Sequence, residues 1–324
     1  MEAIPVKKII CLICVLALLA TLLPAACAQG TVRLGVMTGP TGIGMVKLFS
    51  ETGNTYSYTV VGSPDELTPL FLQGELDIVS VPANLAANLY NKTGGGVCAL
   101  AVNVLGVQYI TALNIDGLDT VADLKGQTIY ASGKGSTPEY FLRYVLTQNG
   151  LDPDRDVTIE WKTEASEIVA LLSQSQSGIA MLPQPYASVA QAKLGENFRV
   201  ALSLSDEWAA LNNGTLCTTA VVMARTEFAQ EHPEAVDAFL SDFAASAQWV
   251  NENVAEAAAL CGEFGIITAP TPVVENAIPK CNIVCIMGNE MKDALSGCLG
   301  VIFEQNPKAV GGAMPLDDFY YGAQ

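Results

Sequence analysis

Twice in this sequence an apolar segment of strand length runs into a glycine-rich turn and then into a segment with helical spacing. The first instance covers residues 32–49, and the second covers residues 127–146. Glycine permits a sharp turn, and the first amide groups of the following helix have no intrahelical acceptor. The helix dipole adds partial positive charge at that point. Two such turns predict one polar or anion-binding seat in each of two lobes, with a ligand held between them.

Strand and helix patterns alternate from residue 31 onward, which predicts an α/β fold with largely parallel sheets. Strands are expected at 32–37, 56–61, 76–81, 97–113 (as one strand or two), 128–131, 157–161, 178–182, 198–202 and 217–224. Helices are expected at 44–50, from 63 to about 74, after 82, and at 136–149, 164–175, 186–194, 233–253, 254–263, 272–279 and 289–304. Ser63 with Glu66 and Ser136 with Glu139 have the spacing of a capping box.

The order of these elements predicts two interleaved lobes, because no long linker divides the chain. Residues 31–107 and 218–324 are expected to form the first lobe, and residues 113–205 the second. The chain would then cross between the lobes twice, near 108–112 and near 206–217.

Composition narrows the class of partner. The chain has 324 residues, of which 50% are hydrophobic and 15% charged, so a sizeable core is expected and disorder is not. Lysine and arginine total 16 against 33 acidic residues, which gives a net charge of -17. Such a balance argues against nucleic acid as a partner. It also means that any anion site must be built locally, from helix ends and a few cations.

The N-terminus is typical of an export signal over residues 1–28. Lys7 and Lys8 precede an apolar run of about 15 residues, which is short for a membrane span. Two processing routes stay open: lipidation of Cys27, as in a bacterial lipoprotein, or ordinary cleavage after Ala28. Pro24 departs from the lipoprotein pattern, which prefers leucine there. Either route predicts an extracytoplasmic protein, and the first adds a lipid anchor in the cell membrane.

The cysteines and the single histidine give little support for catalysis or metal binding. Six cysteines lie beyond the signal: Cys98, Cys217, Cys261, Cys281, Cys285 and Cys298. Buried free thiols, or a disulfide from Cys261 to Cys281 or Cys285, are both compatible with this spacing. The only histidine, His232, stands just before a proline at a helix start, so no Ser-His-Asp set can be built around it. We therefore expect no metal and no cofactor.

Three segments together resemble a known family. They are Leu-Gly-Val-Met-Thr-Gly-Pro-Thr-Gly at 34–42, Gly-Glu-Leu-Asp-Ile-Val-Ser-Val-Pro at 74–82 and Val-Ala-Asp-Leu-Lys-Gly-Gln-Thr-Ile-Tyr at 121–130. With the export signal, they are similar to substrate-binding proteins of ABC importers, of the nitrate/sulfonate/taurine and thiamine-precursor (SsuA/THI5-like) type. The resemblance extends over about 31–305 of the chain.

The resemblance implies a periplasmic-binding-protein-like type II fold, in which two lobes joined by a two-crossing hinge close on a ligand. It implies binding without catalysis, and it implies an ABC permease and its ATPase as partners of a monomer that binds a small-molecule solute. Two other functions stay open on the same fold: a non-transport enzyme, and a ligand sensor for a membrane receptor.

Carried over by position, the resemblance implies a ligand site on both lobes. The expected ligand-binding residues are Thr38, Gly39, Pro40, Thr41, Gly42, Pro82 and Asn84 in the first lobe, and Lys134, Gly135, Ser136, Thr137, Gln184 and Tyr186 in the second. Lys134 suits a sulfonate-like anion, whereas Gln184 and an aromatic pair of Tyr186 and Trp161 suit a pyrimidine-like heterocycle. The ligand stays open between these two classes.

Overall fold

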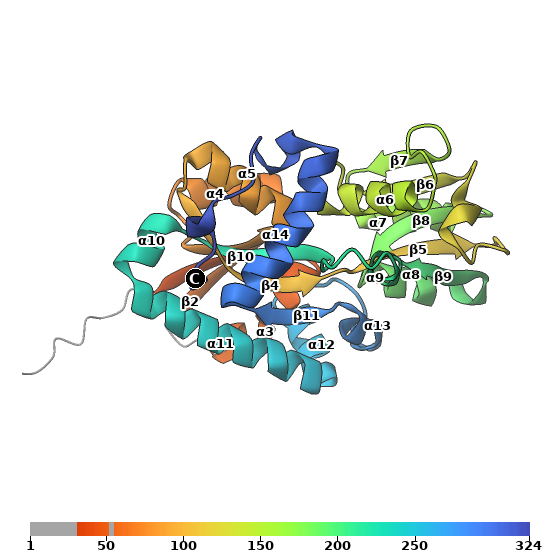
Figure 1. Ribbon diagram of the computed structural model, residues 1–324. Coiled ribbons are helices and arrows are strands. Elements are labelled where there is room, and N and C mark those ends of the chain that lie inside the picture. Colours follow the sequence, from red (N-terminus) through yellow and green to blue (C-terminus); the bar gives the residue numbers. More distant parts are fainter. Residues whose placement is uncertain (1–30, 52–54) are drawn as a thin grey trace, which may run out of the picture. The chain divides into compact units, whose positions relative to one another are not determined.

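Two sheets organise the part of the chain that the computed structural model describes, residues 31–51 and 55–324. Their strands are β1 (Val32–Met37), β2 (Tyr56–Val61), β3 (Ile78–Pro82), β4 (Val97–Leu105), β5 (Gln108–Leu113), β6 (Thr128–Ser132), β7 (Thr158–Lys162), β8 (Gly178–Pro183), β9 (Phe198–Ser203), β10 (Thr218–Arg225) and β11 (Ile283–Ile286). The first sheet has the order β11-β4-β10-β3-β1-β2, and the second has the order β7-β6-β8-β5-β9 (Figure 1). We call each sheet with its helices a lobe.

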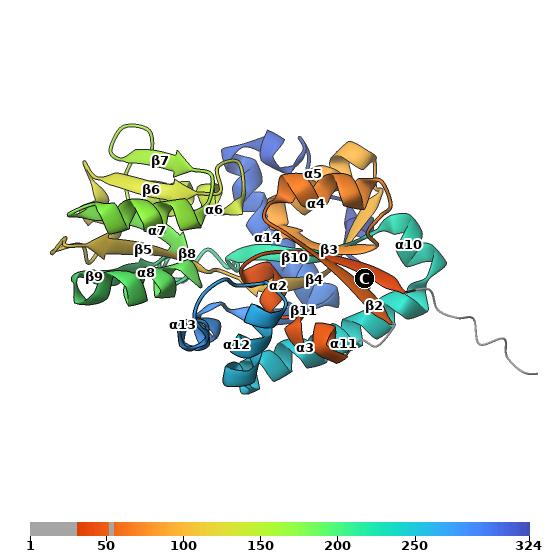
Figure 2. The ribbon, with the colours of Figure 1, turned by 180° about the vertical axis from the view of Figure 1, so that it is seen from behind.

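Helices cover both faces of the first sheet (Figure 2). The helices of this lobe are α2 (Pro40–Ile43), α3 (Val46–Glu51), α4 (Pro64–Leu72), α5 (Ala83–Thr93), α10 (Thr226–Glu231), α11 (Pro233–Glu252), α12 (Val254–Glu263), α13 (Thr271–Ala277) and α14 (Gly288–Gln305), with 3-10 turns η3 (Ile278–Lys280), η4 (Pro307–Val310) and η5 (Asp317–Phe319). Helices α4, α5 and α14 bury apolar side chains on one face of the sheet, and α3, α11 and α12 on the other.

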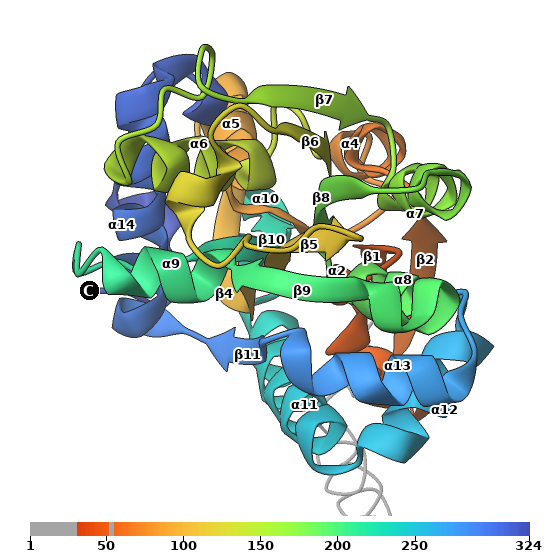
Figure 3. The same ribbon diagram turned by 90° about the vertical axis from the view of Figure 1, so that its right-hand side faces the viewer.

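The second lobe repeats this arrangement on a smaller scale (Figure 3). Its helices are α6 (Thr137–Gln148), α7 (Ala165–Gln174), α8 (Tyr186–Leu194) and α9 (Leu204–Ala210), with 3-10 turns η1 (Val121–Leu124) and η2 (Gly195–Asn197). Helices α7 and α8 cover one face of the sheet and form a core of their own. Helix α6 covers the other face and shares a core with α14 of the first lobe. Residues Val32–Gln324 therefore group into one compact unit.

The chain passes between the sheets twice, and the two passages lie side by side. Strand β4 pairs with β10 in the first sheet, and β5 pairs with β9 in the second. The outward passage consists of Gly106 and Val107, because residues 108–112, which we expected to form the crossing, already belong to β5. The return passage follows α9, which the sequence analysis missed, and covers residues 211–217. Two short passages next to each other are the arrangement that permits hinge motion between lobes.

The expectation of largely parallel sheets is wrong. Strand β1 runs parallel to β2 and β3, but β10 runs antiparallel to both β3 and β4. In the second sheet β5 runs antiparallel to β8 and β9. The physical reason is the route of the chain: β10 returns from the other lobe and inserts between two strands formed more than 100 residues earlier. No local pattern encodes that insertion.

Both expected capping boxes are also wrong, although the helices begin where we expected. Ser63 and Ser136 are the N-caps of α4 and α6, but neither side chain accepts a bond from a helix amide. Glu66 instead accepts from the Ser63 hydroxyl at 3.0 Å. Glu139 accepts from the backbone N–H of Gly135 at 2.6 Å and from Arg143 at 2.9 Å. The acidic side chains thus bond other donors within reach.

The six described cysteines are free thiols, and only Cys285 is partly exposed. Burial raises the pKa of Cys98 and of Cys261 to about 12, so both remain neutral. The disulfide that we kept open for Cys261 is therefore not formed, and these residues act as small apolar side chains. The export signal and Cys27 lie outside the described residues. No helix in the described part of the chain is both long and apolar enough to cross a bilayer.

Candidate functional site

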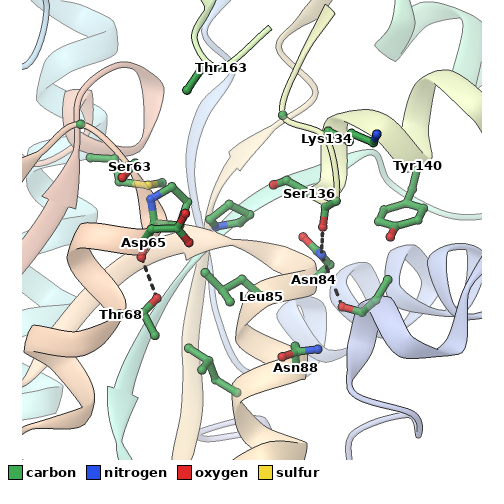
Figure 4. Close-up of a pocket in the computed structure, with 18 of the residues that line it drawn as sticks. Ser63, Asp65, Thr68, Asn84, Leu85, Asn88, Lys134, Ser136, Tyr140 and Thr163 are labelled. Atoms are coloured by element: carbon green, nitrogen blue, oxygen red, sulfur yellow. Dashed lines mark hydrogen bonds between the residues drawn. The ribbon is translucent and has the colours of Figure 1, made fainter. Parts of the chain in front are cut away.

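A cleft runs between the edges of the two lobes and consists of two adjoining hollows of about 960 and 690 Å³. Both hollows are lined by Thr38 and Gly62 from the first lobe and by Gly133 and Thr163 from the second. Shared walls make the two hollows one continuous site. Clefts of this size between lobes are the usual place for a small-molecule ligand. Figure 4 shows the larger hollow, with Ser63, Asp65 and Thr68 on one side and Asn88, Lys134 and Tyr140 on the other.

The first glycine-rich turn lines the cleft only at its beginning. Thr38 is exposed and lines both hollows, and Gly39 lines the smaller one. The backbone N–H of Thr38 donates to Val61 O at 2.9 Å, and that of Gly39 donates to Ile266 O at 2.8 Å. These amides are therefore engaged within the protein and are not free for a ligand.

The rest of this turn faces inward. Thr41 is buried, and its hydroxyl donates to Met37 O at 2.9 Å. Gly42 packs so closely that a Cβ would lie 2.8 Å from Ile266 Cδ1. Neither these residues nor Pro40 line the cleft. Three of the five predicted residues of this turn thus serve packing and hydrogen bonding.

The second glycine-rich turn is closed by a side chain from the first lobe. Asn84 of α5 is 5% exposed, and its Oδ1 accepts from the backbone N–H and the hydroxyl of Thr137, each at 3.0 Å. Its Nδ2 donates to Gly135 O at 3.1 Å and to Ala309 O at 3.4 Å. Asn84 therefore supplies the acceptor that an anion would otherwise supply at the start of α6.

The other amides at this helix start are also occupied. The N–H of Gly135 donates to Glu139, that of Ser136 donates to Gly133 O at 3.0 Å, and Pro138 has none. The predicted backbone seat is thus filled from within the protein. Lys134, Gly135 and Ser136 still line the larger hollow, as do Pro82 and Asn84, whereas Thr137 is fully buried.

Of the other predicted residues, Tyr186 lines the smaller hollow and Gln184 does not reach the cleft. Gln184 is 1% exposed, and its Oε1 accepts from the hydroxyl of Ser188 at 2.9 Å and from its N–H at 3.3 Å. These two bonds hold the Gln184 side chain against the first turn of α8. Trp161, which we expected to stack on a planar ligand together with Tyr186, lines neither hollow. Burial raises the pKa of Tyr186, with Glu164 adding to the effect, so its phenol is neutral at physiological pH.

Lysines dominate the charged residues of the cleft. The larger hollow is lined by Lys92, Lys134, Lys162 and Lys308 against the single carboxylate of Asp65, and the smaller hollow adds Lys193 and Glu164. Five lysines thus face two acids, in a chain whose net charge is -17. No arginine of residues 31–51 or 55–324 lines either hollow. The cleft is a local positive region in an acidic protein, which favours an anionic ligand.

Of these lysines, only Lys134 was expected from the sequence to line the site. Lys92 lies at the end of α5, and Lys308 lies in η4, more than 170 residues after Lys134. Asn88 Nδ2 donates to Lys308 O at 3.1 Å and so helps to hold η4 beside α5. No local signal marks Lys308 as a cleft residue, because its position depends on the return of the C-terminal segment to α5.

The described residues contain no cluster of three histidine, cysteine, aspartate or glutamate side chains that could hold a metal. His232 occupies the N-cap position of α11 without a side-chain capping bond, and it packs against the ring of Phe228, with 5.2 Å between the ring centroids. It lines neither hollow of the cleft. The cleft offers hydroxyls, amides, ammonium groups and apolar surface, which is a set suited to binding a solute.

Known proteins match this chain both in sequence and in structure. The model of the NMT1-like family matches residues 30–262. A crystal structure of an ABC transporter from Parabacteroides distasonis superimposes with a TM-score of 0.74 at 26% identity, covering 90% of this chain and 98% of that one. The periplasmic aliphatic sulphonate binding protein SsuA from Escherichia coli gives a TM-score of 0.71 at 18% identity, covering 88% and 91% of the two chains.

A third solved structure has the same fold. The alkanesulfonate-binding protein SsuA from Xanthomonas axonopodis pv. citri, bound to MOPS, gives a TM-score of 0.65 at 17% identity and covers 86% of this chain and 94% of that one. Among curated proteins no match was found. The expected two-lobed, periplasmic-binding-protein-like fold is thereby confirmed.

Proposed function

This chain belongs to the NMT1-like family, and we propose that it is the solute-binding component of an ABC importer that takes a small organic anion into its cleft. The cationic lining of that cleft carries the proposal, because five lysines gather there in a chain with a net charge of -17. Solved structures of the same fold include proteins described as sulphonate-binding, which agrees with an anionic ligand.

The proposal has a cellular side as well. We propose that the protein works outside the cytoplasm, as a monomer, and delivers its solute to a membrane permease driven by an ATPase. Lipidation of Cys27 would hold it at the membrane. Closure of the lobes on the solute is the step that the permease would recognise, and the two adjacent passages at 106–107 and 211–217 are where the backbone would bend.

The binding site that we propose differs from the one expected from the sequence. Lysine side chains, Thr38 and Ser136 would contact the charged group, while Tyr186 and the apolar side chains of the smaller hollow would contact the rest of the solute. Thr41, Gly42, Thr137 and Gln184 would act indirectly by holding the walls of the cleft. We therefore propose a mixed site with one charged and one apolar part.

Thermal melting of residues 29–324 with a solute panel tests this function. The panel holds alkanesulfonates, taurine, nitrate, phenyl phosphate, aminopyrimidines and amino acids. A solute present at 100 times its dissociation constant adds about 2.7 kcal/mol to the free energy of unfolding, which is readily visible as a shift in Tm. We expect shifts with organic anions that Lys134→Ala reduces to about half.

The matched control is Lys125→Ala, because Lys125 is exposed, pairs with Asp156 at 3.1 Å and lines neither hollow. Shifts with neutral heterocycles alone would keep the binding function and reject the anion. The absence of a shift with any solute would contradict the proposal of a transport receptor.

A further inference from the structure

Three of the four lysines in the larger hollow have no ion-pair partner among the described residues. Lys92, Lys134 and Lys308 make no salt bridge, whereas Lys162 lies 3.4 Å from Glu160. The three come from three separate segments: the end of α5, the turn before α6, and η4. We call them the lysine triad.

Two asparagines of α5 hold the segments of the lysine triad together. Asn84 Nδ2 donates both to Gly135 O, next to Lys134, and to Ala309 O, next to Lys308. Asn88, one helical turn further on, donates to Lys308 O. Lys92 follows on the same face of α5 after one more turn. The backbone segments that carry the triad are therefore held together by hydrogen bonds, and Figure 4 shows Asn84, Asn88 and Lys134 around the same hollow.

The charge of this framework favours a doubly charged group over a singly charged one. Among the described residues, Asp65 is the only carboxylate residue that lines the larger hollow, and it lies on the side opposite Lys134 and Asn88 (Figure 4). Like charges that share one hollow repel, and a ligand with a single negative charge leaves most of that repulsion uncompensated. Arginine binds carboxylate and phosphate bidentately, whereas lysine binds phosphate as a point charge. A lining of lysines therefore selects a ligand by its charge and not by the planar geometry of its oxygens.

The smaller hollow indicates what the rest of the ligand looks like. Its lining includes the apolar side chains of Val169, Val189, Ile266 and Ile267, together with the ring of Tyr186. A free inorganic ion would leave this part of the cleft unused. An apolar or aromatic body would bury its surface there while its charged end reached the lysine triad.

We propose that the solute is an organic phosphate or phosphonate, with its doubly charged group at Lys92, Lys134 and Lys308 and its apolar body against Tyr186. This inference rests on the proposed function, because it names the ligand class of the same cleft. It separates this protein from a receptor for singly charged sulfonates or nitrate, whose ligands need fewer cations.

Isothermal titration of two isosteric esters tests the charge directly. Phenyl phosphate gains its second negative charge near a pKa of about 6, whereas phenyl sulfate keeps one charge throughout. We expect the two to bind alike at pH 5.0. Between pH 5.0 and 7.5, phenyl phosphate should gain affinity by about tenfold, the size of one further charge-assisted hydrogen bond, and phenyl sulfate should not.

Phenyl sulfate also controls for titration of the protein. The titratable groups that line the larger hollow are Asp65, Tyr140 and the four lysines, and any change in them would act on both esters. Lys308→Ala and Lys92→Ala should each reduce the preference for phosphate over sulfate at pH 7.5. Lys125→Ala should leave that preference unchanged, because Lys125 lies outside both hollows. Inorganic phosphate should bind at least tenfold more weakly than phenyl phosphate.

Several results would overturn this inference. Equal binding of the two esters at pH 7.5, or a phosphate preference that survives both lysine substitutions, would reject the doubly charged ligand and leave the proposed function standing. Inorganic phosphate binding as tightly as phenyl phosphate would reject the organic body. If neither ester nor any other anion binds, the proposal of an anion receptor itself is rejected. Melting curves at both pH values show whether each variant is folded.

Discussion

The two glycine-rich turns have the same sequence pattern, but one is largely buried and the other is partly exposed. The turn after β1 is tied down by backbone bonds to Val61 and Ile266, and most of it is buried. The turn before α6 keeps Lys134 and Gly135 exposed at the cleft, while Asn84 closes its helix start from the other lobe. One turn therefore serves the core, and the other lines the ligand site that we propose.

This difference shows that a strand–glycine–helix pattern predicts the backbone conformation of the turn. It does not predict which groups accept hydrogen bonds from the backbone N–H groups of that turn. In both turns the amides find acceptors within the protein, and some of these acceptors, namely Val61, Ile266 and Asn84, lie in distant parts of the chain. The anion site that we propose is built from side chains, with lysines contributed by both lobes.

The largest effect is expected for Asn84→Ala, which opens the second turn. The substitution removes four hydrogen bonds and leaves the buried N–H of Thr137 without its acceptor. We expect the free energy of unfolding to fall by about 3 kcal/mol, measured by urea denaturation. Asn88→Ala, on the same helix face, removes a single bond to Lys308 O and should cost less than about 1 kcal/mol. Equal losses would mean that the closure by Asn84 adds no stability.

Glycine substitutions should separate the two turns by mechanism. Gly42→Val in the first turn forces its side chain against Ile266 and Met37 O, which lies 3.2 Å from the ideal Cβ. We expect a loss of about 2 kcal/mol from overpacking. Gly135→Ala in the second turn meets open space but holds a positive φ of 77°, so strain of about 1 kcal/mol is expected. Denaturant melts of both variants check the order, and the reverse order would contradict the assignment of the first turn to packing.

Affinity should respond to the second turn more than to the first. Lys134→Ala should weaken binding of an organic anion by about tenfold, or 1.4 kcal/mol, without changing the unfolding free energy by more than about 0.5 kcal/mol. Thr38→Ala, in the first turn, removes a neutral hydroxyl and should weaken binding only a few-fold. Titration calorimetry on both variants gives the comparison. A larger effect for Thr38→Ala would show that the charged group of the ligand binds at the first turn, which would contradict the prediction.

The smallest effects concern the hydroxyl groups of the two turns. Thr41→Val removes the bond to Met37 O and should cost about 1 kcal/mol of stability, with no change in ligand affinity. Ser136→Ala should cost less than about 0.5 kcal/mol, because the Ser136 side chain caps no amide of α6. A loss of about 1 kcal/mol for Ser136→Ala would restore the capping box that the spacing predicted.

Much of the fold could be predicted from the sequence, because strand and helix periodicity is local. Strand β2 and helix α8 have the predicted bounds, and Pro64 and Pro138 mark helix starts that the structure confirms. The short elements α9, α10 and β11 were missed. Ile283–Ile286 is a four-residue apolar run, too short for its periodicity to distinguish a strand from a helix.

The site was predictable only in part, because lining a cleft is a property of two surfaces at once. Lys134, Pro82 and Tyr186 line it, as their places after strand ends suggested. Gln184 has a similar place but is buried, since the nearby hydroxyl of Ser188 provides a donor for its side chain. Exposure to a ligand thus depends on which polar groups find partners inside the protein.

The sequence by itself determined the alternation of strands and helices, the two glycine-rich turns and the acidic charge of the chain. Only the tertiary structure decided that β10 inserts between β3 and β4, that Asn84 closes the start of α6, and that Lys308 joins Lys92 and Lys134 around one hollow. The physical reason is the distance along the chain over which each kind of interaction acts. Backbone periodicity is set by neighbours within a few residues, whereas hydrogen-bond saturation and the gathering of charges depend on contacts between segments far apart in the chain.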